Sequence, residues 1–294
     1  MLKLSIAPTD LATPVLPDLT DPSVQVWYEN NGSVCAYGYI ASGQHWMHFP
    51  GLGSYCLSNY SDEVIAFAEP FVRLDWLRDT FYRSVLPMAL QVFGKEALHA
   101  SAIETPYGAI AFCAISESGK STIAYGLSRR GHPLWADDAV VFEICDRGVW
   151  AHPMPFEIRL RPASAQYFGF SRTGADNPAS CDFVSQVNVK PGPLAAVCLL
   201  ERGDRLEPVR IHRMLPIHAF PVVLSHAYCF SLQDMERKRR MMHAYLALVR
   251  EVPVFTIRFS TGLEALPQLL ESIEQEIIHR ITCDKSEFTV SPAS

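Results

Sequence analysis

The first 60 residues alternate between short apolar runs and turn-forming residues. The runs VQVWY from Val24, SVCAYGYI from Ser33 and HWMHF from His45 are rich in β-branched and aromatic residues, which favour strands. Between them lie Asn-Asn-Gly, Ser-Gly and Pro-Gly-Leu-Gly, which favour tight turns. This pattern predicts a small antiparallel sheet at the start of the chain.

From Asp62 the apolar residues recur at steps of three or four, which is typical of helices, and Pro70 and Pro87 are the expected breaks. The periodic positions are Leu74, Leu77, Phe81, Val85, Met88 and Val92.

An α/β pattern follows. The continuous apolar run YGAIAFCAI predicts a strand buried on both faces. A helix over 121–130, ended by Gly131 and Pro133, and a strand over 134–143 come next. The runs LAAVCLL and VPVFTIRF and a last amphipathic helix continue the pattern, with a loop over 171–186 between. The apolar face of the last helix carries Leu266, Leu270, Ile273 and Ile277.

A chain of 294 residues is long enough for about two domains. We expect a small β-rich domain with a linker helix over 1–84 and an α/β domain over 85–294.

Composition excludes several classes of protein. Apolar residues make up 49% and charged residues 19%, which is too apolar for a disordered chain. The net charge of −6 gives no basic field for nucleic acid. No apolar run is long enough to cross a membrane and no secretory signal is recognisable, so we expect a cytoplasmic protein with no membrane partner. The eight cysteines include no CxxC pair and the histidines no HExxH, so buried thiols are favoured over a zinc site.

The segment from Ala114 to Ser121, AISESGKS, lies between the predicted buried strand and a predicted helix. Apart from Ala114, where the pattern has glycine, it matches the Walker A loop. In such a loop backbone N–H groups and the start of the following helix hold the β-phosphate of a nucleotide. Lys120 is expected to reach the β- and γ-phosphates and the Ser121 hydroxyl to bind Mg²⁺. The predicted phosphate-binding residues are Ser116, Glu117, Ser118, Gly119, Lys120, Ser121 and Thr122.

A pair of acids, Asp137 and Asp138, follows Lys120 by seventeen and eighteen residues. Adjacent carboxylates within a strand are costly unless a cation or a proton transfer uses them. Phosphoryl transfer needs one carboxylate for Mg²⁺ and one to accept the proton of the attacking hydroxyl. The alternative is a solvated turn between two strands.

The sequence LHASAIETPYGAIAFCAISESGKSTIAYGLSRRGHPLWADDAVVFE resembles the catalytic domain of the HPr serine kinase/phosphorylase family. It is more similar still to the HPr-kinase-like proteins found beside genes for lasso-peptide and other modified-peptide biosynthesis, in which a Leu-Pro-x-Ala-Leu run precedes this segment. The match covers about Leu86 to Val141, weaker similarity extends to VPVF, and the first 80 residues are similar in layout only. The resemblance implies an α/β P-loop kinase domain of the HPr-kinase type, which is phosphoenolpyruvate-carboxykinase-like, with a small β-rich N-terminal domain.

The resemblance also implies roles for single residues. Asp137 matches the general base for the acceptor hydroxyl, Asp138 the metal ligand, and His99 a histidine near the acidic pair. A core histidine bonded to the backbone is the alternative for His99.

Two further matches are less complete. Glu157, in Phe-Glu-Ile-Arg-Leu, matches a glutamate near the metal. Leu160 replaces the glycine of that family signature and the rest of it is absent, so phosphorylase activity is not expected. Lys190 matches a basic loop ahead of a strand and is either a phosphate contact or a solvated lysine.

The basic run ERKRR from Glu236 lies on a predicted helix and is expected to be a solvated face. A patch that binds an acidic peptide is the alternative. The apolar stripe expected on this helix is Met235, Met242, Leu246 and Val249.

Together these features predict an enzyme that uses ATP and Mg²⁺ to phosphorylate a Ser or Thr hydroxyl on a protein or peptide, with a modified-peptide precursor favoured over HPr. A P-loop ATPase or GTPase switch is an alternative, although no NKxD or LSGGQ motif is present. A non-catalytic nucleotide-binding partner is another. The sequence leaves open whether the chain forms a homo-oligomer.

Overall fold

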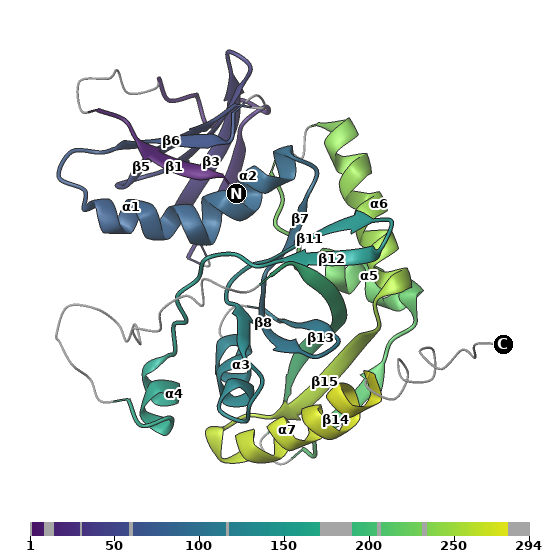
Figure 1. Ribbon diagram of the computed structural model, residues 1–294. Coiled ribbons are helices and arrows are strands. Elements are labelled where there is room, and N and C mark those ends of the chain that lie inside the picture. The colour runs from purple at the N-terminus through teal and green to yellow at the C-terminus, as the bar shows by residue number, and fades with distance from the viewer. Residues whose placement is uncertain are drawn as a thin grey trace. The chain divides into compact units, whose positions relative to one another are not determined.

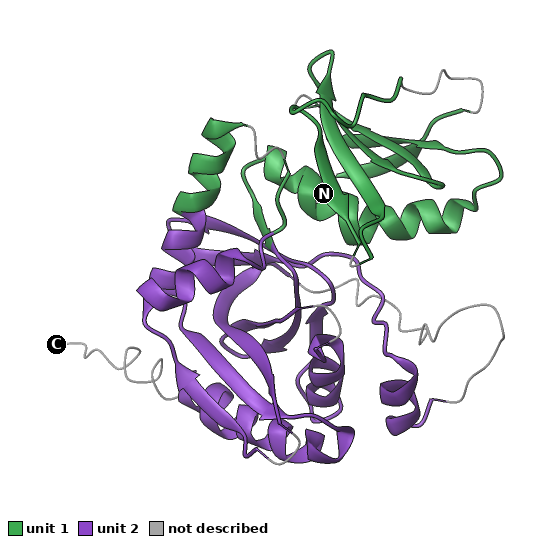
Figure 2. Cartoon of the chain, turned by 180° about the vertical axis from the view of Figure 1, so that it is seen from behind, with its two compact units in different colours: residues 1–97, 228–243 green, residues 98–227, 244–294 purple. Residues whose placement is uncertain are grey.

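The computed structural model describes residues 2–8, 15–29, 31–58, 61–115, 118–170, 190–204, 207–230 and 234–281 (Figure 1). The chain forms two compact units (Figure 2). Unit 1 comprises residues 1–97 and 228–243, and unit 2 comprises residues 98–227 and 244–294. The strand β7 (Glu96–Leu98) and the helix α6 (Met235–Glu251) each contribute to both units. The expected domain boundary after residue 84 concerns independent folding and stays a prediction.

Unit 1 contains a six-stranded sheet in the order β1-β6-β5-β4-β3-β2. The antiparallel strands predicted at its start are confirmed, but β1 pairs with β6 in parallel, so the sheet is mixed. The helix expected from Asp62 is wrong at its start, because Glu63–Ala68 forms β6 with alternating burial. The other strands are β1 (Lys3–Ile6), β2 (Gln25–Tyr28), β3 (Val34–Ala41), β4 (Gln44–Phe49) and β5 (Gly53–Leu57).

The helical segment after the sheet continues through Pro87, one of the two prolines expected to break it. It consists of α1 (Leu74–Thr80), the π-helical turn η1 (Phe81–Val85) and α2 (Leu86–Val92). Pro87 lies in the first turn of α2, directly after η1. Proline lacks an N–H and its ring crowds the carbonyl four residues earlier, and the wider π-helical turn accommodates both effects.

Unit 2 is built on a larger mixed sheet whose strands run in the order β10-β8-β9-β13-β12-β11. The strand β9 is parallel to β13, and β13 is parallel to β15, so these three strands end at the same edge of the sheet. The mixed α/β class predicted from the sequence is confirmed. The strands are β8 (Ala100–Thr105), β9 (Gly108–Cys113), β10 (Leu134–Ala136), β11 (Val140–Cys145), β12 (Gly148–His152), β13 (Gly192–Gly203), β14 (Arg210–Arg213) and β15 (Val254–Ser260).

The helices of unit 2 pack around this sheet to form its core. The helix α3 and the last helix, α7, lie against each other, and a Cβ on Gly126 would come within 2.7 Å of the Leu270 side chain. All four apolar positions predicted for the last helix are buried in the core of unit 2. The helices are α3 (Lys120–Ser128), α4 (Pro162–Tyr167), α5 (Pro216–Leu224), η2 (Leu263–Ala265), α7 (Leu266–Ile273) and η3 (Glu274–Ile278).

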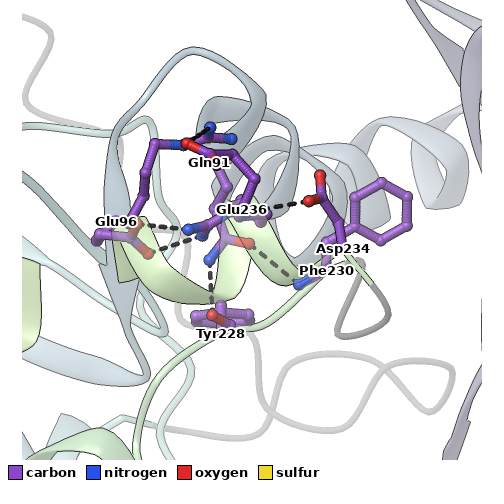
Figure 3. A network of polar contacts seen from close by, with 8 residues as sticks. Gln91, Glu96, Tyr228, Phe230, Asp234 and Glu236 are labelled. Carbon is purple, nitrogen blue, oxygen red and sulfur yellow. Dashed lines mark hydrogen bonds and ion pairs between the residues drawn. The ribbon is translucent and has the colours of Figure 1, made fainter. Parts of the chain in front are cut away.

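The basic run on α6 is not entirely a solvated face. Arg237 is buried and donates two hydrogen bonds, of 2.7 and 2.8 Å, to the Glu96 carboxylate. Gln91 bonds the backbone of Tyr228 and Phe230 beside this pair (Figure 3). The ion pair fixes the start of α6 within unit 1.

The apolar stripe on α6 differs in part from the expected one, although Val249 is buried as predicted. The buried residues follow Arg237 at helical spacing, whereas Met235 and Leu246 are exposed. The buried apolar positions of α6 are Met241, Tyr245, Leu248 and Val249.

The six cysteines within the described ranges are all free. Burial raises the pKa of the Cys113 thiol to about 12. Across those ranges, every helix is too short or too polar to span a bilayer.

We expect Arg237→Ala to lower the free energy of unfolding by about 3–5 kcal/mol, because it leaves the Glu96 carboxylate buried without its partner. Arg239→Ala is the matched control, since Arg239 is exposed on the same helix. Urea denaturation measures both variants. Equal stabilities of the two would contradict the structural role of the pair.

Candidate phosphate-binding site

The loop predicted to bind phosphate connects the buried strand β9 to α3. Gly119 precedes the helix with φ +100°, a left-handed conformation that favours glycine. Ala114, the departure from the Walker A pattern, is buried, and its carbonyl oxygen accepts a hydrogen bond of 3.1 Å from Lys120 Nζ. The methyl group at Ala114 therefore coexists with an ordered lysine. Ser116 and Glu117 lie outside the described residues.

Lys120 is held inside the loop by His99. Lys120 Nζ lies 3.1 Å from His99 Nε2, and His99 Nδ1 lies 3.1 Å from the Asp138 carbonyl oxygen. A carbonyl can only accept, so Nδ1 carries the proton and Nε2 accepts from the ammonium group, which assigns a neutral His99. Burial is the largest effect on the pKa of Lys120 and lowers it, whereas Asp138 is the main charge that raises it.

The aspartate pair lies in the break between β10 and β11, not within a strand as expected. Asp138 has φ +64°, a left-handed conformation that aspartate tolerates better than most residues. Its carbonyl also accepts the N–H of Ala100, 3.2 Å away. Asp137 is only 6% exposed, so the alternative of a solvated turn does not describe this residue.

Three donors surround the Asp137 carboxylate. The hydroxyls of Ser101 and Ser121 donate to Oδ1 at 2.6 and 2.7 Å, and the backbone N–H of Arg159 lies 3.4 Å from Oδ2. Burial and the neighbouring Asp138 charge raise the pKa of Asp137 to about 6, against the effect of these hydrogen bonds.

The sequence reasoning missed Ser101 and His226, which the structure brings to this site. Ser101 lies on β8 two positions after His99 and is fully buried, and a polar residue between two alanines was the available signal. The backbone carbonyl oxygen of His226 accepts a hydrogen bond of 2.7 Å from the backbone N–H of His99. Burial, and to a lesser degree the charge of Lys120, lower the pKa of His226. No local motif marks His226, because it is distant in sequence.

The other predicted residues are less closely tied to the loop. The Thr122 hydroxyl lies 2.9 Å from the Ser164 hydroxyl. Glu157 is exposed two residues before Arg159, whose N–H approaches Asp137. Lys190 is exposed next to residues outside the described ranges. The predicted roles of these three residues therefore stay predictions.

Comparisons with known proteins add little to this description. No protein-family model and no curated protein matches the chain. Among solved structures, the chain is similar to one described as the Hpr(Ser) kinase/phosphatase from Coxiella burnetii, with 14% sequence identity and a TM-score of 0.36. The similarity covers 67% of this chain and 99% of the other. At this TM-score we draw neither fold nor function from it.

The raised pKa of Asp137 predicts how the stability of the ligand-free protein depends on pH. An aspartate that binds its proton more tightly when folded stabilises the fold below its unfolded pKa, and that stability is lost as the pH rises through about 6. Asp137→Asn cannot ionise. The unfolding free energy of the wild type should therefore fall relative to this variant, by at most about 1.4 kcal/mol per pH unit between about pH 4 and 6.

Chemical denaturation of metal-free protein across this pH range measures the difference. Asp146→Asn, at an exposed turn, is the control and should parallel the wild type. A constant difference between Asp137→Asn and wild type would contradict the raised pKa.

Proposed function

We propose that this protein is a nucleotide-dependent phosphotransferase of the P-loop kinase type, which uses Mg·ATP to phosphorylate a hydroxyl group. The observation that carries the proposal is the hydrogen bond between Ser121, in the loop, and the buried Asp137. It joins a phosphate-binding loop to an acidic pair in one site, together with Lys120.

The residues present fit a nucleotide phosphate chain. The start of α3 offers backbone N–H groups, and a buried lysine lies at its first turn. A Cβ built on Gly119 would meet Arg202 Nη2 at 3.8 Å, an ordinary van der Waals contact, so a small group fits beside the backbone there. The amino group of Lys120 already lies inside the loop. To bind phosphate it needs only to exchange its contacts with His99 and the Ala114 carbonyl for contacts with phosphate oxygens.

The residues also fit Mg²⁺, since Ser121, Asp137 and Asp138 supply the oxygen atoms that this ion prefers. Among the described residues no group of three or more His, Cys, Asp and Glu is arranged to hold a metal by itself. This agrees with an ion that takes its remaining ligands from phosphate and water. When bound, Mg²⁺ would offset negative charge on the transferred phosphoryl group.

The contact with Ser121 favours a division of roles between the two aspartates opposite to the one that the family resemblance implies. Asp137 is buried and both hydrogen bonds to its Oδ1 come from serines, which suits a group that orients Ser121 beside the metal. Asp138 is more exposed and is the main charge that raises the pKa of Lys120. A base must reach an acceptor that enters from solvent, so we propose Asp138 as the general base.

The acceptor is proposed to be a Ser or Thr of a peptide, and a precursor of a modified peptide is favoured over HPr. This part of the proposal rests on the resemblance described above. Hydrolysis of ATP without an acceptor would instead support a P-loop ATPase.

Lys120→Ala should weaken the binding of Mg·ATP by about 10- to 100-fold, because a charge-assisted contact with phosphate is lost. Isothermal titration calorimetry measures the dissociation constant. Lys238→Ala, on the exposed face of α6, should bind as wild type does. Unchanged affinity in the Lys120 variant would refute the nucleotide site.

The two aspartates should separate in a transfer assay that detects the mass of one added phosphate on each candidate peptide and on HPr. Asp138→Asn should bind Mg·ATP but transfer about 10²- to 10⁴-fold more slowly, the usual scale of general-base catalysis. Asp137→Asn should raise the Mg²⁺ concentration needed for half-maximal rate. The opposite result in both variants would restore Asp137 as the base, and transfer to HPr alone would refute the peptide acceptor.

A further inference from the structure

A second positive charge besides Lys120 lies at the loop, on a strand that no motif marks. The strand β9 ends at Cys113, opposite Leu199 of β13. The strand β13 continues to Gly203, beyond the end of β9. At about 3.3 Å per residue, Arg202 is carried roughly 10 Å past the point where β9 turns into the loop.

The face of β13 on which Arg202 lies is the one that leads to the loop. Side chains of a strand alternate between faces, so Arg202 shares a face with Leu200 and Cys198. Both of these residues belong to the core that includes α3. Arg202 continues this face toward the start of α3 and emerges into solvent there.

The Arg202 side chain touches the loop directly. Arg202 Nε lies 3.4 Å from the Ser118 carbonyl oxygen, and its Nη2 lies 3.8 Å from where a Cβ on Gly119 would be. Because the guanidinium group has five N–H donors in a fork, one contact with a carbonyl leaves donors for an anion.

Arg202 differs from the neighbouring arginine in its charge balance. Arg258 lies on β15 opposite Glu201 of β13. It forms an ion pair with Glu207, with 2.7 Å between Arg258 Nε and Glu207 Oε2. Within the described ranges no carboxylate pairs with Arg202. Its charge is therefore available to a bound anion next to the loop.

We propose that Arg202 binds the phosphate chain of the nucleotide from the outer side of the loop, complementing Lys120 on the inner side. The inference rests on the proposed nucleotide site and adds a residue to it. The anion is expected to be a polyphosphate. The N–H groups of the loop can hold one phosphate, and the Arg202 charge beside the loop can then contact a neighbouring phosphate of the same chain.

Calorimetric titration with Mg·ATP and with inorganic tripolyphosphate tests this role. Arg202→Gln is the informative variant, since its amide keeps a donor for the Ser118 carbonyl but loses the charge. We expect it to bind both ligands about tenfold more weakly than wild type, which is the low end for a charge-assisted contact at an exposed site. Arg258→Ala is the matched control, one strand away and paired with Glu207, and should bind both ligands as wild type does.

Three results would overturn the proposal. Wild-type affinity in Arg202→Gln would show that Arg202 only shapes the loop. A loss for Mg·ATP but not for tripolyphosphate would place Arg202 on the ribose or base. An equal loss in Arg258→Ala would show that general surface charge is responsible.

The same titrations separate this inference from the proposed function. If binding depends on Lys120 but not on Arg202, the nucleotide site stands and only the role of Arg202 fails. If the wild type binds neither ligand, the proposed function fails and the role of Arg202 fails with it.

Discussion

The candidate site depends on how the buried Asp137 carboxylate is satisfied. A carboxylate removed from water is costly unless donors replace its hydration. Ser101, Ser121 and the Arg159 N–H come from three separate segments and converge on it. The hydrogen bonds of one side chain thus tie strand β8, the start of α3 and the segment before α4 to the break after β10.

The parallel strands determine what else reaches this place. The strands β9, β13 and β15 end at one edge of the sheet, and such edges collect functional groups in α/β proteins. Lys120 reaches this edge at the start of α3, after the loop that follows β9, and Arg202 reaches it on β13. His99 lies directly before β8, the antiparallel neighbour of β9. The lowered pKa of Lys120 and the raised pKa of Asp137 both express the cost of placing charges in a buried position before a ligand is present.

Local patterns in the sequence predicted the elements whose signals are themselves local. The apolar run that became β9, the glycine and lysine of the loop and the periodic residues of α7 were found in this way. The local pattern could not show that the acidic pair falls in a break between strands. The Asp137 carboxylate is held there by Ser101 and Arg159, which are distant from it in sequence. The pattern also misassigned the face of α6, since a buried arginine looks like a solvated one until its partner Glu96 is known. Arg202 was missed because only the register of β13 with β9, two strands distant in sequence, brings it to the loop.

The most direct test of the account is a crystal structure of the protein with Mg²⁺ and a non-hydrolysable ATP analogue. We predict that the β-phosphate lies against the N–H groups of residues 118–121, with Lys120 Nζ moved from His99 to a phosphate oxygen and Asp137 still bonded to Ser121. A nucleotide bound elsewhere, with the Lys120–His99 contact intact and no phosphate at the loop, would contradict it.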